Sequence, residues 1–138
     1  MDEFQFRPSF EQLPAFKSFE GTIRLPGSKS ITNRAFLISA LSAGETRLHN
    51  LLKSDDTRYM GEALQKLGVK IDFSDDFSEA VVSGNAGPID APATPDGASA
   101  KLFLGNAGTA MRSLTAALTL GHGEFSLMGE ERMRERPI

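Results

Sequence analysis

The sequence predicts an α/β fold built from repeated strand–helix units. Three observations favour this fold class: strand-like and helix-like segments alternate along the chain, glycine-containing loops precede two of the helical segments, and the second half repeats the order of the first. Alternation of this kind is typical of domains in which helices cover a sheet. With 138 residues, 40% of them hydrophobic and 24% charged, the chain has the size and composition of about one globular domain.

The first expected helix follows a short strand and a turn. Residues 21–25 have the composition of a strand, and the Pro-Gly pair that follows them is typical of a turn. Ser28 and Ser30 are residue types that cap the start of a helix, and the mostly apolar residues 35–41 supply its body. We therefore expect a helix from about Ser28 that ends before the next glycine.

A strand over 46–52 and a second helix are expected next. The Ser-Asp-Asp sequence at 54–56 opens this helix, and Gly68 ends it. The apolar residues at helical spacing are Met60, Ala63, Leu64 and Leu67. Strands over 69–73 and 80–82 then follow, joined by a turn that contains two aspartates.

The second half repeats this order after a Gly-, Pro- and Ala-rich stretch over 84–97, which we interpret as a linker. A helix that begins at Arg112 and reaches Ala117-Leu118 is expected, followed by a strand over 125–128. Arg112 lies 78 positions after Arg34, and a second pair of arginines, at 58 and 136, has the same separation. A period of this length predicts repeated βαβ-type units rather than a short solenoid repeat.

The repeat also predicts where the chain is interrupted. In the first copy an amphipathic helix and two strands follow the arginine at 58, whereas only Pro137 and Ile138 follow the arginine at 136. Because proline favours the first turn of a helix, we expect the chain to stop where a helix begins, and we interpret it as truncated. The expected organisation is an N-terminal lead-in over 1–20, a first unit over about 21–90 and a truncated second unit over about 98–138.

Charge and composition exclude several classes of function. The net charge is −3, the pI is near 5.4 and no long basic run occurs, which argues against nucleic-acid binding. There is no cysteine, and His49 and His122 are isolated, so no metal site is expected. No apolar run is long enough to span a membrane, and the acidic, aromatic N-terminus resembles no targeting signal. We therefore expect a cytoplasmic protein without a metal.

Two helix starts carry the residues expected to bind anions. Free backbone N–H groups at a helix start attract phosphate and carboxylate. At the first start, Lys29 adds a mobile positive charge and Arg34 adds a guanidinium fork one turn inside the helix. At the second, Gly108 lets a ligand approach the backbone closely. The alternative is that the serines only cap a helix, that Lys29 is only solvated and that the second loop is an ordinary turn.

Four segments, in order, match one family of enzymes. They are Gly21-Thr22-Ile23-x-Leu25-Pro26-Gly27-Ser28-Lys29-Ser30-x-x-Asn33-Arg34-Ala35, then Ser54-Asp55-Asp56, then Leu102-Phe103-Leu104-Gly105-Asn106-Ala107-Gly108-Thr109-Ala110-Met111-Arg112, then Arg132-Met133-x-Glu135-Arg136-Pro137-Ile138. Together they resemble the 5-enolpyruvylshikimate-3-phosphate synthases. The resemblance runs from about Gly21 to the last residue and covers roughly the first third of what that family's chain contains.

The resemblance implies a fold and a reaction. The fold is the enolpyruvyl transferase fold: two domains, each of three βαβαββ units around a pseudo-threefold axis, of which this chain would hold about the first two units of one domain. The reaction transfers the enolpyruvyl group of phosphoenolpyruvate to the 5-hydroxyl of shikimate 3-phosphate and releases phosphate. It implies no cofactor, no metal, a usually monomeric enzyme, and a second domain that is normally in the same chain. The leading strand at 21–25 would belong to that other domain.

The resemblance also implies roles for seven residues. Lys29 corresponds to a lysine that touches both substrates, while Ser30 and Arg34 correspond to residues that hold shikimate 3-phosphate. The residues that correspond to the phosphoenolpyruvate site are Gly108 and Arg136, with Asn106 and Thr109 shaping the same loop. The family's acid and base residues belong to later segments, so no catalytic residue is assigned in this chain. We therefore expect the chain alone to show no turnover.

The sequence departs from the family at one position and leaves two alternatives open. The family commonly has proline where this chain has Ser113, and replacement of that proline by serine is associated there with reduced sensitivity to glyphosate. One alternative is the related transferase acting on UDP-N-acetylglucosamine, although its first loop has Lys-Asn where this chain has Lys29-Ser30. The other is an inactive truncated remnant that at most binds anions.

Overall fold

The computed structural model describes residues 15, 18, 20–92 and 99–137, so the lead-in expected over 1–20 lies almost wholly outside the described residues. The elements in chain order are α1 (Lys29–Leu41), β1 (Ala43–Leu48), α2 (Asp55–Lys66), β2 (Lys70–Phe73), β3 (Ala80–Asn85), β4 (Ala100–Phe103), α3 (Gly108–Leu118), β5 (Phe125–Met128) and α4 (Glu131–Arg134). Strands and helices alternate as predicted, and the starts of α1 and α3 lie 79 positions apart.

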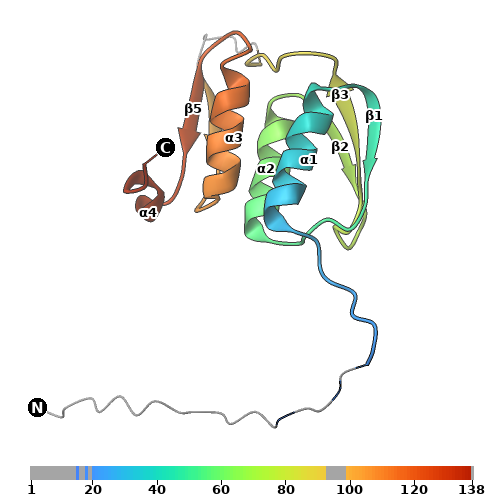
Figure 1. Ribbon diagram of the computed structural model, residues 1–138. Helices are drawn as coiled ribbons and strands as arrows, with labels where there is room; N and C mark the ends of the chain where they lie inside the picture. The colour runs from blue at the N-terminus through green and yellow to red at the C-terminus, as the bar shows by residue number, and fades with distance from the viewer. Residues whose placement is uncertain (1–14, 16–17, 19, 93–98, 138) are drawn as a thin grey trace, which may run out of the picture.

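The strands form two small sheets beside a layer of helices. β3 lies between β1 and β2 and is antiparallel to both, whereas β4 and β5 pair in parallel across the connecting helix α3. Figure 1 shows α1, α2 and α3 running in the same direction, with their first residues at the lower end of the molecule. Helix α1 packs against both α2 and α3. This arrangement brings three helix starts to one end.

A single hydrophobic core joins the helices to the sheets. Its largest fully buried side chains include Phe36 of α1, Met60 and Leu64 of α2, and Leu114 of α3. Phe36 meets the ring of Phe73 edge-on at a centroid distance of 5.8 Å, which fixes α1 against the β2–β3 hairpin. The helical spacing that predicted α2 therefore corresponds to its buried face.

The strand expected over 21–25 does not form, and this prediction is wrong for the described structure. Residues 20–28 have no regular secondary structure, and Ile23 and Leu25 are 68% and 72% exposed. A strand requires a neighbouring backbone to accept and donate its hydrogen bonds, and no described segment pairs with these residues. Residues 21–25 therefore have the composition of a strand but no strand to pair with among the described residues.

Three other boundaries differ from expectation, and one short helix was not predicted. Helix α3 begins at Gly108 rather than at Arg112. The strand expected over 46–52 is β1, which begins earlier because Ala43 pairs with the last residue of β3, and it ends before Asn50, whose φ is 55°. Within the linker expected over 84–97, Ile89 is fully buried, so that part belongs to the core. The arginine-rich run before Pro137 forms the short helix α4, because Met133 is buried against the core.

The turn between β2 and β3 is closed by the side chain of Asp76. Its carboxylate accepts hydrogen bonds from the backbone N–H of Ser78 at 3.0 Å and from the hydroxyls of Ser74 and Ser78, both at 2.8 Å. These donors, the Ser78 N–H first among them, lower the pKa of Asp76 from 3.8 to about 2. The ionised carboxylate is thus the form that the folded turn prefers.

Asp76→Asn is expected to lower the unfolding temperature at neutral pH, because the amide accepts these hydrogen bonds less strongly. The folded pKa lies below the unfolded one, so the stabilisation is fully present above about pH 4 and is lost as the pH falls through about 2. Thermal unfolding at pH 7, 4, 3 and 2 measures the effect, with Asp75→Asn in the same turn as control. A difference from the parent that stayed constant down to pH 2 would contradict this account.

Candidate functional site

The starts of α1 and α3 are open, whereas the start of α2 is closed. Thr57 N–H donates to the Ser54 hydroxyl at 3.4 Å, and Ser54 N–H donates to Thr57 Oγ1 at 3.2 Å, which forms a capping box on α2. Neither Ser28 at the start of α1 nor Ala107 at the start of α3 makes a side-chain capping bond. Free backbone N–H groups therefore remain at the start of α1, and at the start of α3 the N–H groups of Thr109 and Ala110 have no partner among the described residues.

The residues predicted to bind at α1 lie on its first two turns. Lys29 is the first residue of the helix, is about half exposed, and places its Nζ 3.3 Å from Oδ1 of Asp56. Ser30 follows it and is partly buried, while Arg34 is exposed one turn further on. The sequence assigned Asp56 only to a helix start. The structure shows that this carboxylate, at the beginning of α2, holds the Lys29 ammonium at the lower end of the molecule.

Of the four residues predicted at α3, three lie close together, and the fourth, Thr109, is bonded to Ser113 instead. Gly108 is the first residue of the helix, and a Cβ atom added to it would lie 3.4 Å from Nη1 of Arg136. The same guanidinium nitrogen donates to the backbone carbonyl of Asn106 at 3.3 Å. The carbonyl of Thr109 accepts the hydroxyl of Ser113 at 2.8 Å. Asn106, Gly108 and Arg136 therefore form one cluster, in which the absent Cβ of Gly108 leaves the guanidinium close to the backbone.

The loop before α3 is fixed by residues that the sequence did not single out. Gly105 has a φ of +51°, and any Cβ there would meet the ring of Tyr59 at 2.4 Å. The Glu130 N–H donates to the Gly105 carbonyl at 3.2 Å, and the Asn106 amide donates to the Glu130 carboxylate. Tyr59 packs edge-on against Phe103 of β4. Only a glycine fits at 105, and the sequence offered no pattern that pairs it with Tyr59.

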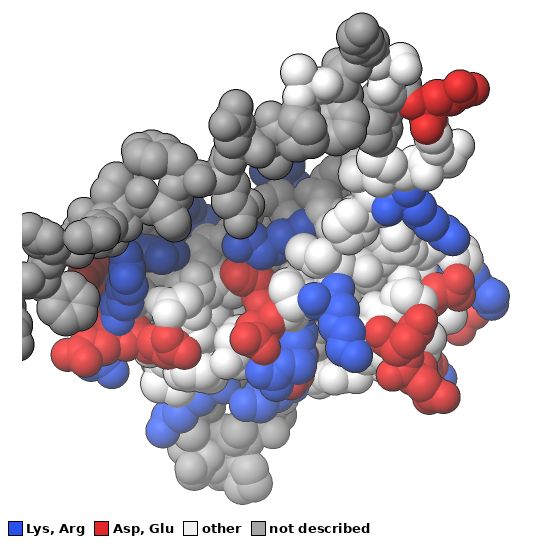
Figure 2. Space-filling view, turned by 90° about the horizontal axis from the view of Figure 1, so that it is seen from below, with Lys and Arg blue, Asp and Glu red and all other residues white. Residues whose placement is uncertain are grey.

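The two groups share one face of the molecule. Figure 1 places the starts of α1 and α3 at the same end, and Figure 2 shows that end from below, with lysine and arginine side chains interspersed with carboxylates. Arg112 of α3 adds a further guanidinium, which donates to the Pro137 carbonyl at 2.9 Å. Among the described residues, no hydrogen bond or ion pair joins the Lys29 group directly to the Gly108 group. Helices α1 and α3, which carry the two groups, pack against each other.

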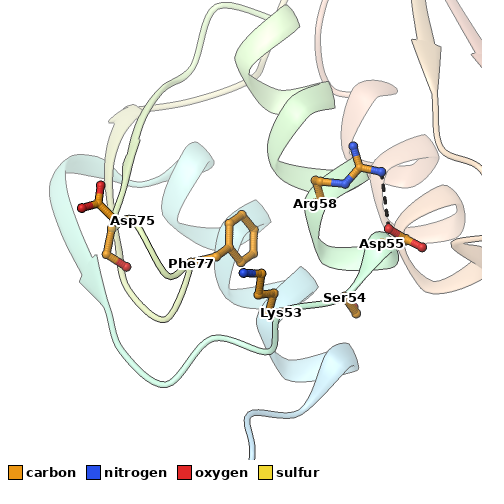
Figure 3. A pocket seen from close by; sticks show the side chains of 7 residues that line it. Lys53, Ser54, Asp55, Arg58, Asp75 and Phe77 are labelled. Carbon is orange, nitrogen blue, oxygen red and sulfur yellow. Dashed lines mark hydrogen bonds and ion pairs between the residues drawn. The ribbon is translucent and has the colours of Figure 1, made fainter.

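A separate surface pocket of about 480 Å³ lies beside the start of α2. Figure 3 shows Lys53 extending toward the ring of Phe77, with Asp75 on one side and Arg58 on the other. The pocket contains none of the residues predicted to bind substrates. Arg58 is already paired with Asp55 at 3.4 Å and with Glu62 at 2.9 Å, and the charge of Glu62 raises the pKa of this guanidinium. Its charge is thus largely balanced within α2.

Two absences can be stated for the described part of the chain. No group of three or more histidine, cysteine, aspartate or glutamate side chains there is placed to hold a metal ion. None of the helices described is both long and apolar enough to cross a membrane.

Fold and site together define a class of protein. This is a repeated α/β protein that presents two uncapped helix starts, each with a nearby cation, on one face, an arrangement suited to small anionic ligands. The family model for EPSP synthase (3-phosphoshikimate 1-carboxyvinyltransferase) matches residues 14–138. The chain therefore belongs to the EPSP synthase family.

Individual relatives agree with this assignment. A 3-phosphoshikimate 1-carboxyvinyltransferase from Sulfurovum sp. is 55% identical over 126 residues, which are 91% of this chain and 28% of that protein. One from Yersinia ruckeri is 57% identical over 118 residues, 86% of this chain and 26% of that protein. A solved EPSP synthase from Acinetobacter baumannii matches with a TM-score of 0.72 at 30% identity, over 91% of this chain and 27% of that one. The chain thus has the α/β fold of these enzymes and spans just over a quarter of their length.

Proposed function

We propose that this chain supplies part of the active site for the transfer of an enolpyruvyl group from phosphoenolpyruvate to the 5-hydroxyl of shikimate 3-phosphate. The observation that carries the proposal is the pair of open helix starts on one face, together with the 55% identity to a 3-phosphoshikimate 1-carboxyvinyltransferase. Both substrates are anions that carry a phosphate and a carboxylate. We further propose that residues from about 21–90 and about 98–138 are a first unit and a truncated second unit of one domain, with the leading segment 21–25 extending to the other domain, and that the enzyme is monomeric and cytoplasmic.

The two helix starts divide the substrates between them. Ser30 and Arg34 hold shikimate 3-phosphate at α1, where the Arg34 fork matches a carboxylate. Gly108 and Arg136 hold phosphoenolpyruvate at α3, with the loop shaped by Asn106 and Thr109. Lys29 reaches both substrates because its ammonium, on a long flexible side chain, is about half exposed beside Asp56.

These cations act by holding two anions together. The substrates repel each other in water, and fixed positive groups compensate that repulsion while setting the 5-hydroxyl against the central carbon of phosphoenolpyruvate. Addition of the hydroxyl and a proton gives a tetrahedral ketal, from which phosphate leaves as the proton is lost. The acid and base for these proton transfers are not assigned to residues of this chain.

A chimera tests the proposal. This chain replaces the matching segment of the Sulfurovum relative, and phosphate release is measured with both substrates. We expect the chimera to turn over and the 138-residue chain alone to show no turnover, since it carries only part of the site. A folded but inactive chimera would favour the alternative of a remnant that at most binds anions. Activity with UDP-N-acetylglucosamine in place of shikimate 3-phosphate would favour the related transferase.

Ser113→Pro in the chimera is expected to increase inhibition by glyphosate, which competes for the phosphoenolpyruvate site. Ser113 lies on α3, and its hydroxyl donates a hydrogen bond to the carbonyl of Thr109 in the first turn of that helix. Proline at this position removes that hydroxyl and a backbone donor, and shifts the first turn of α3. The measurement is the inhibition constant at fixed phosphoenolpyruvate. Equal constants for the two proteins would show that Ser113 does not affect the site.

A further inference from the structure

Asn33 of α1 has a buried side chain whose hydrogen-bonding groups are unused. It is 0% exposed, and both its Nδ2 and its Oδ1 lack a hydrogen-bond partner among the described residues, the only buried side-chain atoms there of which this is true. A buried amide without partners is unfavourable, and leucine of similar size would fill the position at lower cost. The presence of asparagine at position 33 is therefore not explained by a contribution to stability.

Asn33 lies on the buried face of α1. Thr32 accepts the N–H of Leu52 at 3.1 Å, and Phe36 contacts the ring of Phe73, so these two residues mark the side that faces the 50–52 loop and the hairpin. A turn of about 100° per residue puts Asn33 about 60° further round the buried face than Phe36, and α1 also packs against α2 and α3. Lys29 lies one turn earlier on the same face.

The start of α3 offers groups that an amide can bind. Its cap residue Ala107 makes no side-chain bond, and the described backbone bonds of the loop satisfy the N–H of Ala107, Gly108 and Met111 but not those of Thr109 and Ala110. An asparagine side chain has both donors and an acceptor, so it can bond a free N–H and a carbonyl of such a loop together. In the present structure it bonds neither.

We propose that Asn33 is a positioning residue for the loop over 105–109. When an anion binds between the starts of α1 and α3, a small shift of α3 toward α1 brings this loop onto the Asn33 amide. The new bonds fix Gly108 and Arg136 at a set spacing from Lys29. This inference rests on the proposed function, because it assumes that the ligand bridges the two helix starts.

The test is Asn33→Leu in the chimera, compared with the parent for both unfolding temperature and steady-state kinetics. We expect the unfolding temperature to stay equal or rise, because the substitution removes an unpartnered amide, while KM for phosphoenolpyruvate rises about tenfold. Asn33→Thr, which keeps a donor and an acceptor, is expected to recover part of the affinity. The control is Ser39→Ala, a buried polar residue on the distal half of α1, which is expected to leave KM unchanged.

The outcomes separate this inference from the proposed function. If the parent chimera is active and Asn33→Leu keeps its KM, the amide is only a core group, and the positioning role is wrong while the function stands. A lower unfolding temperature together with unchanged KM would show that the amide has a structural partner, such as a buried water, and would likewise overturn the role. An inactive parent chimera would contradict the proposed function and this inference with it.

Discussion

Replacing Phe36 by alanine is expected to lower the free energy of unfolding by about 3–5 kcal/mol. The side chain is fully buried and touches the rings of Phe73 and Phe77 edge-on, at 5.8 and 6.5 Å between centroids. It packs α1 against the β2–β3 hairpin, so the cavity left by its removal lies between two elements rather than within one. Domains of this size are stable by only about 5–15 kcal/mol, so the variant approaches the limit of folding.

Urea denaturation followed by circular dichroism measures this change. Ile38→Ala on the same helix is the matched control, because Ile38 is 65% exposed and its loss is expected to change the free energy of unfolding by no more than about 0.5 kcal/mol. Equal losses for the two variants would mean that α1 is not packed as described. A selective loss for Phe36→Ala would locate the core between α1 and the hairpin.

The sequence predicted the helices well because local signals define them. Apolar spacing and the Ser54 cap determine α2, and the small-residue loops determine where α1 and α3 begin. The parallel pairing of β4 with β5 follows from the intervening helix, as expected of a βαβ unit. These features depend on residues that are close in the chain, and a single sequence contains that information.

Strand positions were predicted less well because they depend on distant partners. The segment over 21–25 has a strand's composition but no partner among the described residues, and β1 was displaced because β3 extends to pair with its first residues. Burial of Ile89 in the expected linker also comes from contacts made far along the chain: a Cβ added to Gly121 would lie 2.0 Å from its carbonyl oxygen. The composition of a segment indicates that it can form a strand or enter the core, but it does not determine which other segments it packs against.

For the site, the sequence supplied the residues but not their partners. The match to a family identified Lys29, Gly108 and Arg136, yet nothing local pairs Lys29 with Asp56, 27 positions later. The same limit applies to the ring of Tyr59 against Gly105. Asn33 was visible only as part of a motif, and its unpartnered amide became apparent only from its burial. Tertiary packing decides each of these pairs.

Lys29→Ala in the chimera is expected to lower kcat/KM by about 10²–10³-fold, the range found when one charge-stabilising group is removed from an active site. Lys29 is the cation proposed to reach both substrates, and no other described residue of α1's first turn carries a positive charge. Steady-state kinetics with both substrates measures the effect. The matched control is Lys70→Ala, because Lys70 is an exposed lysine at the start of β2, paired with Asp72 at 3.7 Å, and its loss is expected to leave kcat/KM unchanged.

Part of the Lys29→Ala effect is expected to come from Asp56. Removal of the ammonium leaves this carboxylate, which is 19% exposed, without its 3.3 Å partner at the place where two anionic substrates are proposed to meet. Its negative charge then repels the substrates that Lys29 had attracted. The double variant Lys29→Ala/Asp56→Asn removes both charges and is expected to recover part of kcat/KM relative to Lys29→Ala alone. If the double variant had the same kcat/KM as Lys29→Ala, the charge of Asp56 would not affect substrate binding. The whole loss of kcat/KM would then come from the missing contact between Lys29 and the substrates.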